Sequence, residues 1–292
     1  PAQLGLLNIN PFLPAPTQRL DAHLDMLATI MSVSAFGGAG ANLSAWMRQL
    51  LRIFVCRRWM IRNGWRETTR LTREQQHAIL YKTGEQVCAE GFLATPRGQS
   101  STLFELCDFW DGHRKELLTE LTGGQVGAHL ADLGGVITAR INELGMSLLS
   151  YFDYTPQGRP LAALLYTRAI VSLQDASEAD VALLVSLLAF GAVESALLQP
   201  TADRLRTLVV IEEAHRVMLR ETGATTEFQS AKGRLAGTFA RAFRELRSRG
   251  VGLIAIDQSP HTLIDEAFAN TGTKVAHRLQ LPEDQGHLPQ AS

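Results

Sequence analysis

Two short apolar runs in the second half of the chain place the strongest constraint on its fold. Residues 207–211 (Thr-Leu-Val-Val-Ile) and 251–256 (Val-Gly-Leu-Ile-Ala-Ile) are rich in β-branched residues, and each run ends at polar side chains. A stretch with helical character, residues 225–248, separates them. Strands that alternate with helices pair in parallel. We therefore predict an α/β fold with a mostly parallel sheet flanked by helices, and further strands at 169–173 and 274–281.

Helical periodicity dominates the first half of the chain. Apolar residues recur at intervals of three to four over 20–30, 43–58 and 128–150. Residues 72–75 match a capping box, which predicts a helix that begins there and runs through Ala89. A short apolar run at the very start of the chain (Leu-Gly-Leu-Leu-Asn-Ile, ending at residue 9) is consistent with a buried strand closed by a turn.

These patterns predict three regions. A core strand and turn occupy 1–16, a mainly helical insertion or subdomain follows at 17–158, and a core that carries the sheet spans 159–292. Within the helical region, glycine and proline surround a short helix predicted at 103–110, so we expect 93–127 to form an exposed connection.

Composition excludes several classes of protein. With 46% hydrophobic residues the chain is not dominated by disorder, and its net charge of −1 means that any contact with DNA must come from local patches. The three cysteines form no metal-binding or disulfide pattern, which fits a reducing cytoplasm. The longest apolar run, Val181–Val193, has 13 residues. A membrane-spanning helix needs about 20, so we predict a buried helix and no membrane partner.

Two adjacent carboxylates, Glu212 and Glu213, follow the run at 207–211. The carboxyl ends of parallel strands are where α/β sheets bind ligands. Successive strand residues point to opposite sides, so one carboxylate can serve a Mg²⁺ shell while the next orients an attacking water. Two acids at a helix N-terminus would also complement the helix dipole. The pair alone leaves both interpretations open.

Polar residues near this pair add to the pattern. Gln258 follows the next predicted strand, and an amide there can sense a γ-phosphate, position water or cap a turn. His215 has no H-E-x-x-H motif and no cysteine partner, which favours a positioning or helix-start residue over a metal ligand.

Taken together, these motifs resemble the HerA/FtsK class of DNA-pumping ATPases, and HerA-like proteins most closely. The similarity is specific over 159–285 and loose over 1–158. It is carried by Val210-Ile-Glu-Glu-Ala-His215, Arg244-Glu-Leu-Arg-Ser-Arg-Gly250, Ile256-Asp-Gln-Ser-Pro260, Asn270 and Lys274-Val-Ala-His-Arg-Leu279.

The resemblance implies a RecA-like core in a hexameric ring around double-stranded DNA, with ATP and Mg²⁺ as cofactors and a nuclease or defence effector as a possible partner. Carried over residue by residue, Glu212 would hold Mg²⁺ through water, although the family pattern has aspartate there. Glu213 would polarise the attacking water, and Gln258 would read the nucleotide state. Arg247 or Arg249 would reach the nucleotide of a neighbouring subunit.

One expected motif is missing from the sequence. A P-loop needs G-x-x-x-x-G-K-[ST], yet none of the four lysines follows a glycine. The glycine-rich segment Gly37–Gly40 has no lysine and is predicted to break a helix. We expect these 292 residues alone not to hydrolyse ATP. We expect the sequence to be N-terminally truncated; the alternative is a non-catalytic scaffold subunit that keeps the ATPase fold.

Arginine is concentrated in one segment of the helical region. Between Arg48 and Arg73 there are eight arginines and a single acid, Glu67. Such a segment could bind phosphates or a partner, or could be a solvated basic face.

Overall fold

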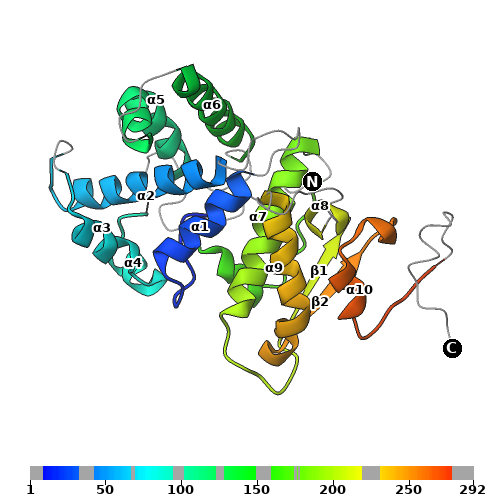
Figure 1. The fold of residues 1–292 in the computed structure, drawn as a ribbon. Helices are drawn as coiled ribbons and strands as arrows, with labels where there is room; N and C mark the ends of the chain where they lie inside the picture. The colour runs from blue at the N-terminus through cyan, green and yellow to red at the C-terminus, as the bar shows by residue number, and fades with distance from the viewer. Residues whose placement is uncertain are drawn as a thin grey trace, which may run out of the picture. The chain divides into compact units, whose positions relative to one another are not determined.

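The fold is mixed α/β and mostly helical, with a small two-stranded parallel sheet (Figure 1). The chain divides into two compact units, Pro1–Leu184 and Val185–Ser292. The computed structural model describes residues 9–32, 43–66, 70–94, 102–122, 128–148, 159–173, 176, 178–218 and 231–277.

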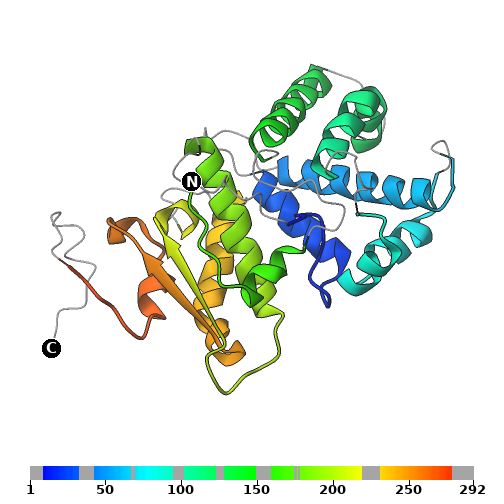
Figure 2. The same cartoon turned by 180° about the vertical axis from the view of Figure 1, so that it is seen from behind.

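Helices build the first unit. Helix α1 packs against α2, which also contacts α3 and α5, and α5 lies beside α6 (Figures 1 and 2). The helices predicted at 20–30, 43–58 and 128–150 are confirmed by α1, α2 and α6. The bounds are α1 Leu20–Met31, α2 Leu43–Arg62, α3 Arg73–Leu80, α4 Gly84–Glu90, α5 Thr102–Leu121, α6 Ala128–Leu148 and the 3₁₀ helix η1 Leu161–Tyr166.

The capping box at 72–75 begins a helix as predicted, but this helix does not reach Ala89. Helix α3 ends at Leu80, and Thr83 forms a second capping box with Gln86 that starts α4. Each box satisfies backbone N–H groups that a helix start leaves without partners. The predicted single helix is therefore two.

The short helix predicted at 103–110 is part of a longer one, and the expectation that 93–127 is an exposed connection is wrong over 102–121. Helix α5 fills residues 102–121, and it buries Leu106, Trp110 and Leu117 completely. The indole Nε1 of Trp110 donates a hydrogen bond of 3.0 Å to Thr138 Oγ1 on α6. The apolar positions follow helical spacing, and the glycine and proline that suggested a loop fall largely at the two ends of the segment.

The second unit carries the parallel sheet. Strands β1 (Thr207–Glu212) and β2 (Val251–Ile256) pair in parallel, with Thr207 opposite Val251 and Glu212 opposite Ile256. Both predicted strands are confirmed. Helices α7 and α9 run along the strand pair (Figures 1 and 2). The remaining elements are α7 Glu178–Leu197, α8 His215–Met218, α9 Ala231–Glu245, η2 Leu246–Arg249, η3 Pro260–Thr262 and α10 Asp265–Ala269.

The two faces of the sheet differ in burial. Ile211 and Val251 are each only 5% exposed on one face. The other face carries apolar side chains that are about half exposed, because no described helix or strand covers them. They are Leu208, Val210, Ile254 and Ile256.

The predicted strand at 169–173 is absent, and 274–277 is not a strand either. Both segments lie without a ladder partner, and Ile170 is 99% and Val275 81% exposed. An apolar run becomes a strand only where a neighbouring strand accepts its hydrogen bonds. Residues 278–281, the start of the chain before Ile9 and the segment Gly37–Gly40 lie outside the described residues.

The apolar run Val181–Val193 lies within α7, which confirms the predicted buried helix. Among the helices that the structure describes, none is both long enough and apolar enough to cross a lipid bilayer.

Candidate functional site at the strand ends

The carboxyl ends of β1 and β2 bring together residues that are far apart in the sequence. The strands are parallel and in register, so the residues that follow each strand lie at one edge of the sheet. There the Gln258 amide nitrogen Nε2 donates a hydrogen bond of 2.9 Å to the Glu213 carboxylate oxygen Oε1. The acid and the amide that the sequence singled out are thus in direct contact.

Glu213 has an unusual backbone conformation. Its φ is +52°, and it is the one non-glycine residue with positive φ in the part of the chain that the structure describes. This left-handed region costs an ordinary residue on the order of 1 kcal/mol. Glu213 lies just past the end of β1, so the strict alternation of strand side chains no longer governs its direction. The turn aims its carboxylate at Gln258.

Asp257 is the central buried acid of this edge, with a side chain only 3% exposed. Its Oδ2 accepts hydrogen bonds from the His215 backbone N–H at 2.8 Å and from the His215 ring nitrogen Nδ1 at 2.9 Å. Its Oδ1 accepts from the Ser259 backbone N–H at 2.8 Å. Asp257 therefore ties the end of β2 to the start of α8.

Sequence reasoning assigned no role to Asp257. Its position between a strand and Gln258 was a signal, since a polar residue directly after a buried strand must find partners at the sheet edge. His215 begins α8, as expected for a helix-start residue. No group of three or more histidine, cysteine or acidic side chains among the described residues could hold a metal ion.

Glu212 is the last residue of β1, and it is exposed. Its side chain forms no hydrogen bond or ion pair with any other described residue. A single carboxylate of this kind fits Mg²⁺, which keeps several waters and takes its other ligands from substrate phosphates.

The two candidate arginines lie at the opposite end of the strand pair. Arg247 and Arg249 belong to η2, before β2 begins, whereas Gln258 follows the end of β2. A six-residue strand spans roughly 20 Å, so neither arginine meets Glu213 in its own chain. Arg249 donates to the Gln199 carbonyl at 2.6 Å. Arg247 is exposed, and its side chain has no hydrogen-bond or ion-pair partner among the described residues.

Half of the arginines in the segment 48–73 are paired with carboxylates from other helices. Carboxylates from α1 and α5 pair with four of its eight arginines, although the segment itself contains one acid. These ion pairs indicate that much of the cluster stabilises the helical unit. The pairs are Arg48 with Asp25 at 2.9 Å, Arg52 with Asp21 at 2.7 Å, Arg57 with Glu116 at 2.7 Å, and Arg58 with Glu105.

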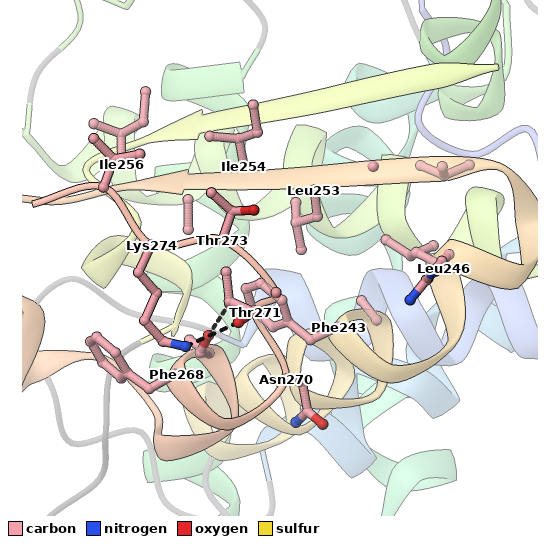
Figure 3. A pocket seen from close by; sticks show the side chains of 18 of the residues that line it. Phe243, Leu246, Leu253, Ile254, Ile256, Phe268, Asn270, Thr271, Thr273 and Lys274 are labelled. Carbon is pink, nitrogen blue, oxygen red and sulfur yellow. Dashed lines mark hydrogen bonds between the residues drawn. The ribbon is translucent and has the colours of Figure 1, made fainter. Parts of the chain in front are cut away.

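A groove of about 1700 Å³ runs along β2 (Figure 3). Phe243, Leu246 and Leu253 give it an apolar lining, and residues 271–274 form part of its wall. It extends to Gln258, so it reaches the strand ends that carry the candidate site.

Comparisons with known proteins identify no relative: no family model, curated protein or solved structure matches the chain.

Proposed function

We propose that the chain is part of a hexameric, ATP-driven DNA translocase of the HerA type, with a RecA-like core. The observation that carries the proposal is the 2.9 Å hydrogen bond between Gln258 and Glu213 across the ends of two adjacent parallel strands. An acid that polarises water and an amide that reads the γ-phosphate must share one ligand, and so must lie at one sheet edge.

The exposed parts of the sheet support a larger, RecA-like sheet. Parallel sheets are usually covered on both faces, and three or more strands are needed for independent stability. One face of β1 and β2 is half exposed, and the groove beside β2 leaves room along the strand. Further strands and a covering layer would bury both.

The residues at the strand ends divide the work of ATP hydrolysis in this proposal. Glu212 would hold Mg²⁺ through water, and the ion would neutralise charge on the nucleotide phosphates. Glu213 Oε2 has no hydrogen-bond donor at normal distance among the described residues, so it can accept one from the attacking water. Gln258 would exchange its bond to Glu213 for a γ-phosphate oxygen, and the exchange would free the carboxylate.

The positions of Arg247 and Arg249 support a role for one of them at the nucleotide of a neighbouring subunit. Because Arg247 and Arg249 lie at the opposite end of β2, either could meet only a neighbouring subunit's nucleotide. Arg247 is the stronger candidate, since Arg249 is engaged with Gln199. In a ring, the motor would contact duplex DNA through backbone phosphates, and a nuclease or defence effector would be its partner.

The decisive test is Glu213→Gln in a polypeptide that includes a phosphate-binding loop, because these 292 residues contain no such motif. The amide keeps the shape of the side chain but removes the base. We expect ATP binding to persist and turnover to fall by at least about 100-fold. Glu245→Gln, the same change at an exposed position in α9, is the control and should leave turnover intact.

Equal turnover in the Glu213→Gln and unsubstituted proteins would reject the assignment. A protein that binds no ATP yet assembles with DNA or a partner would favour the alternative, a scaffold subunit that keeps the ATPase fold.

A mixing experiment tests the arginine. Rings that combine Arg247→Ala subunits with Glu213→Gln subunits contain some interfaces with both residues intact, so they should recover part of the lost turnover. Mixed rings that stay inactive would argue against action across the subunit boundary.

A further inference from the structure

Two residues at the strand ends have no part in the proposed chemistry so far. Asp257 is almost completely buried, and every hydrogen bond described for its carboxylate comes from His215 or Ser259. A cap on the start of α8 would need only the bond to the backbone N–H of His215. The second bond, which the His215 imidazole donates to Asp257, calls for another explanation.

The bond to Asp257 fixes the state of the His215 ring. An ionised carboxylate can only accept hydrogen bonds, so the proton of a neutral imidazole must sit on Nδ1, which is 2.9 Å from Asp257 Oδ2. The ring nitrogen Nε2 is then an acceptor. A carboxylate that holds a histidine in one tautomer and one orientation is a recurring arrangement at catalytic sites.

The oriented imidazole of His215 lies close to the carboxylate of Glu213. His215 Nδ1 is 3.6 Å from Glu213 Oε2, while Gln258 donates to Glu213 Oε1. The two oxygens of Glu213 therefore face two different polar groups. Glu213 is 41% exposed and has a left-handed backbone, so without these neighbours its side chain would be free to rotate.

We propose that Asp257 and His215 form a positioning pair that holds the Glu213 carboxylate in the orientation needed to polarise water. Asp257 fixes the imidazole, and the Nδ1–H edge of the imidazole attracts Glu213 Oε2. The inference rests on the proposed function, because it assigns to Glu213 the role given there.

The first experiment does not depend on ATP hydrolysis. The tautomer of His215 is measured by ¹⁵N NMR on the 292-residue chain at about pH 8.5, where an ordinary histidine is neutral. The His215 signal is assigned by its loss in His215→Asn. We expect the proton on Nδ1, and we expect this preference to be lost in Asp257→Ala, which removes the acceptor. A proton on Nε2 in the unsubstituted chain would overturn the pair.

The second experiment measures turnover in the polypeptide that includes a phosphate-binding loop. We expect Asp257→Asn and His215→Ala each to lower kcat by about 10- to 100-fold, because a small misplacement of a catalytic group costs that much. The KM for ATP should stay within about threefold, since the pair does not touch the nucleotide. Asp203→Asn, the same change at an exposed site before β1, should leave kcat unchanged.

The conservative variant separates positioning from simple structural loss. In His215→Asn the side-chain nitrogen Nδ2 can stand where Nδ1 stood, so it can still donate to Asp257. This variant should recover most of the kcat that His215→Ala loses.

The possible failures are distinct. If kcat falls equally in His215→Asn and His215→Ala, or in neither, the positioning role is wrong even though ATP is hydrolysed. If the unsubstituted protein hydrolyses no ATP, the proposed function fails, and the positioning of a catalytic carboxylate fails with it. The NMR result would then still show whether Asp257 orients His215.

Discussion

The two buried arginines of the first unit contrast with two exposed charged side chains of the second unit. In the first unit, Arg58 and Arg140 have side chains only 10% and 4% exposed, and each pairs with a carboxylate and donates to backbone carbonyls. In the second unit, the side chains of Glu212 and Arg247 are exposed and have no hydrogen-bond or ion-pair partner among the described residues. Buried and paired charge serves stability, whereas exposed and unpaired charge is available to a ligand.

Arg58 gives the largest expected effect on stability. It pairs with Glu105 and donates to the Phe92 and Ala94 carbonyls at 3.0 and 3.2 Å. Burial lowers the pKa of Arg58 to about 10, which still leaves it charged at neutral pH. We expect Arg58→Ala to lower the free energy of unfolding by about 3 to 5 kcal/mol in urea titrations, because it leaves the buried Phe92 carbonyl and the half-buried Glu105 carboxylate without this partner.

The matched control for Arg58 is Arg247→Ala in the second unit. Its side chain is exposed, so the change in unfolding free energy should stay within about 0.5 kcal/mol. Similar losses of unfolding free energy in Arg58→Ala and Arg247→Ala would contradict this difference between a buried and an exposed arginine.

His23 predicts a pH dependence that belongs to the first unit. The ring is fully buried, with Nε2 2.8 Å from the Pro11 carbonyl, and burial lowers the pKa of His23 to about 4. The unfolded chain takes up this proton near the ordinary pKa of about 6.5. The contribution of His23 to the free energy of unfolding is therefore fully present above about pH 6.5. It is lost as the pH drops to 4, by about 3 kcal/mol.

Unfolding measured by urea between pH 7 and pH 4 checks this prediction. The dependence of the unfolding free energy on pH should become weaker in His23→Gln. It should be unchanged in His77→Gln, because His77 is exposed. An unchanged slope in His23→Gln would place the pH dependence elsewhere.

Glu213 gives the smallest expected effect on stability. It allows a comparison within the second unit between a left-handed residue, Glu213, and a strand residue, Glu212. Its φ of +52° suits glycine better than alanine, so Glu213→Gly should be about 1 kcal/mol more stable than Glu213→Ala. At Glu212, within β1, the order should reverse, because glycine weakens a strand. Thermal unfolding of the four variants tests both orders. The same order at both positions would contradict the left-handed assignment.

The sequence predicted those parts of the fold that depend on local patterns. The periodicity of α1, α2 and α6, the strands β1 and β2 and their parallel pairing could all be derived from it. It also singled out Glu213 and Gln258, because polar residues that follow two parallel strands must share one sheet edge.

What the sequence could not predict depends on partners that are distant in the chain. The segment 169–173 has the composition of a strand, yet pairing decides whether it forms one. The arginines of α2 looked unpaired because their acids come from α1 and α5. The role of Asp257 depends on His215, 42 positions earlier, and the backbone of Glu213 depends on the turn between β1 and α8.

The half-exposed face of the sheet bears on how the chain behaves in solution. Beside this face, the unpaired edge of a strand is a template for pairing with other chains. Natural proteins protect such edges with charge, proline or a covering element. Ile254 and Ile256 of β2 bring neither charge nor proline to this face, and the groove beside them is lined with apolar side chains. We expect this surface, while it is uncovered, to favour association between copies of the chain that rises with concentration. The substitutions that β2 can accept are therefore limited by association between chains as well as by the chemistry of the site.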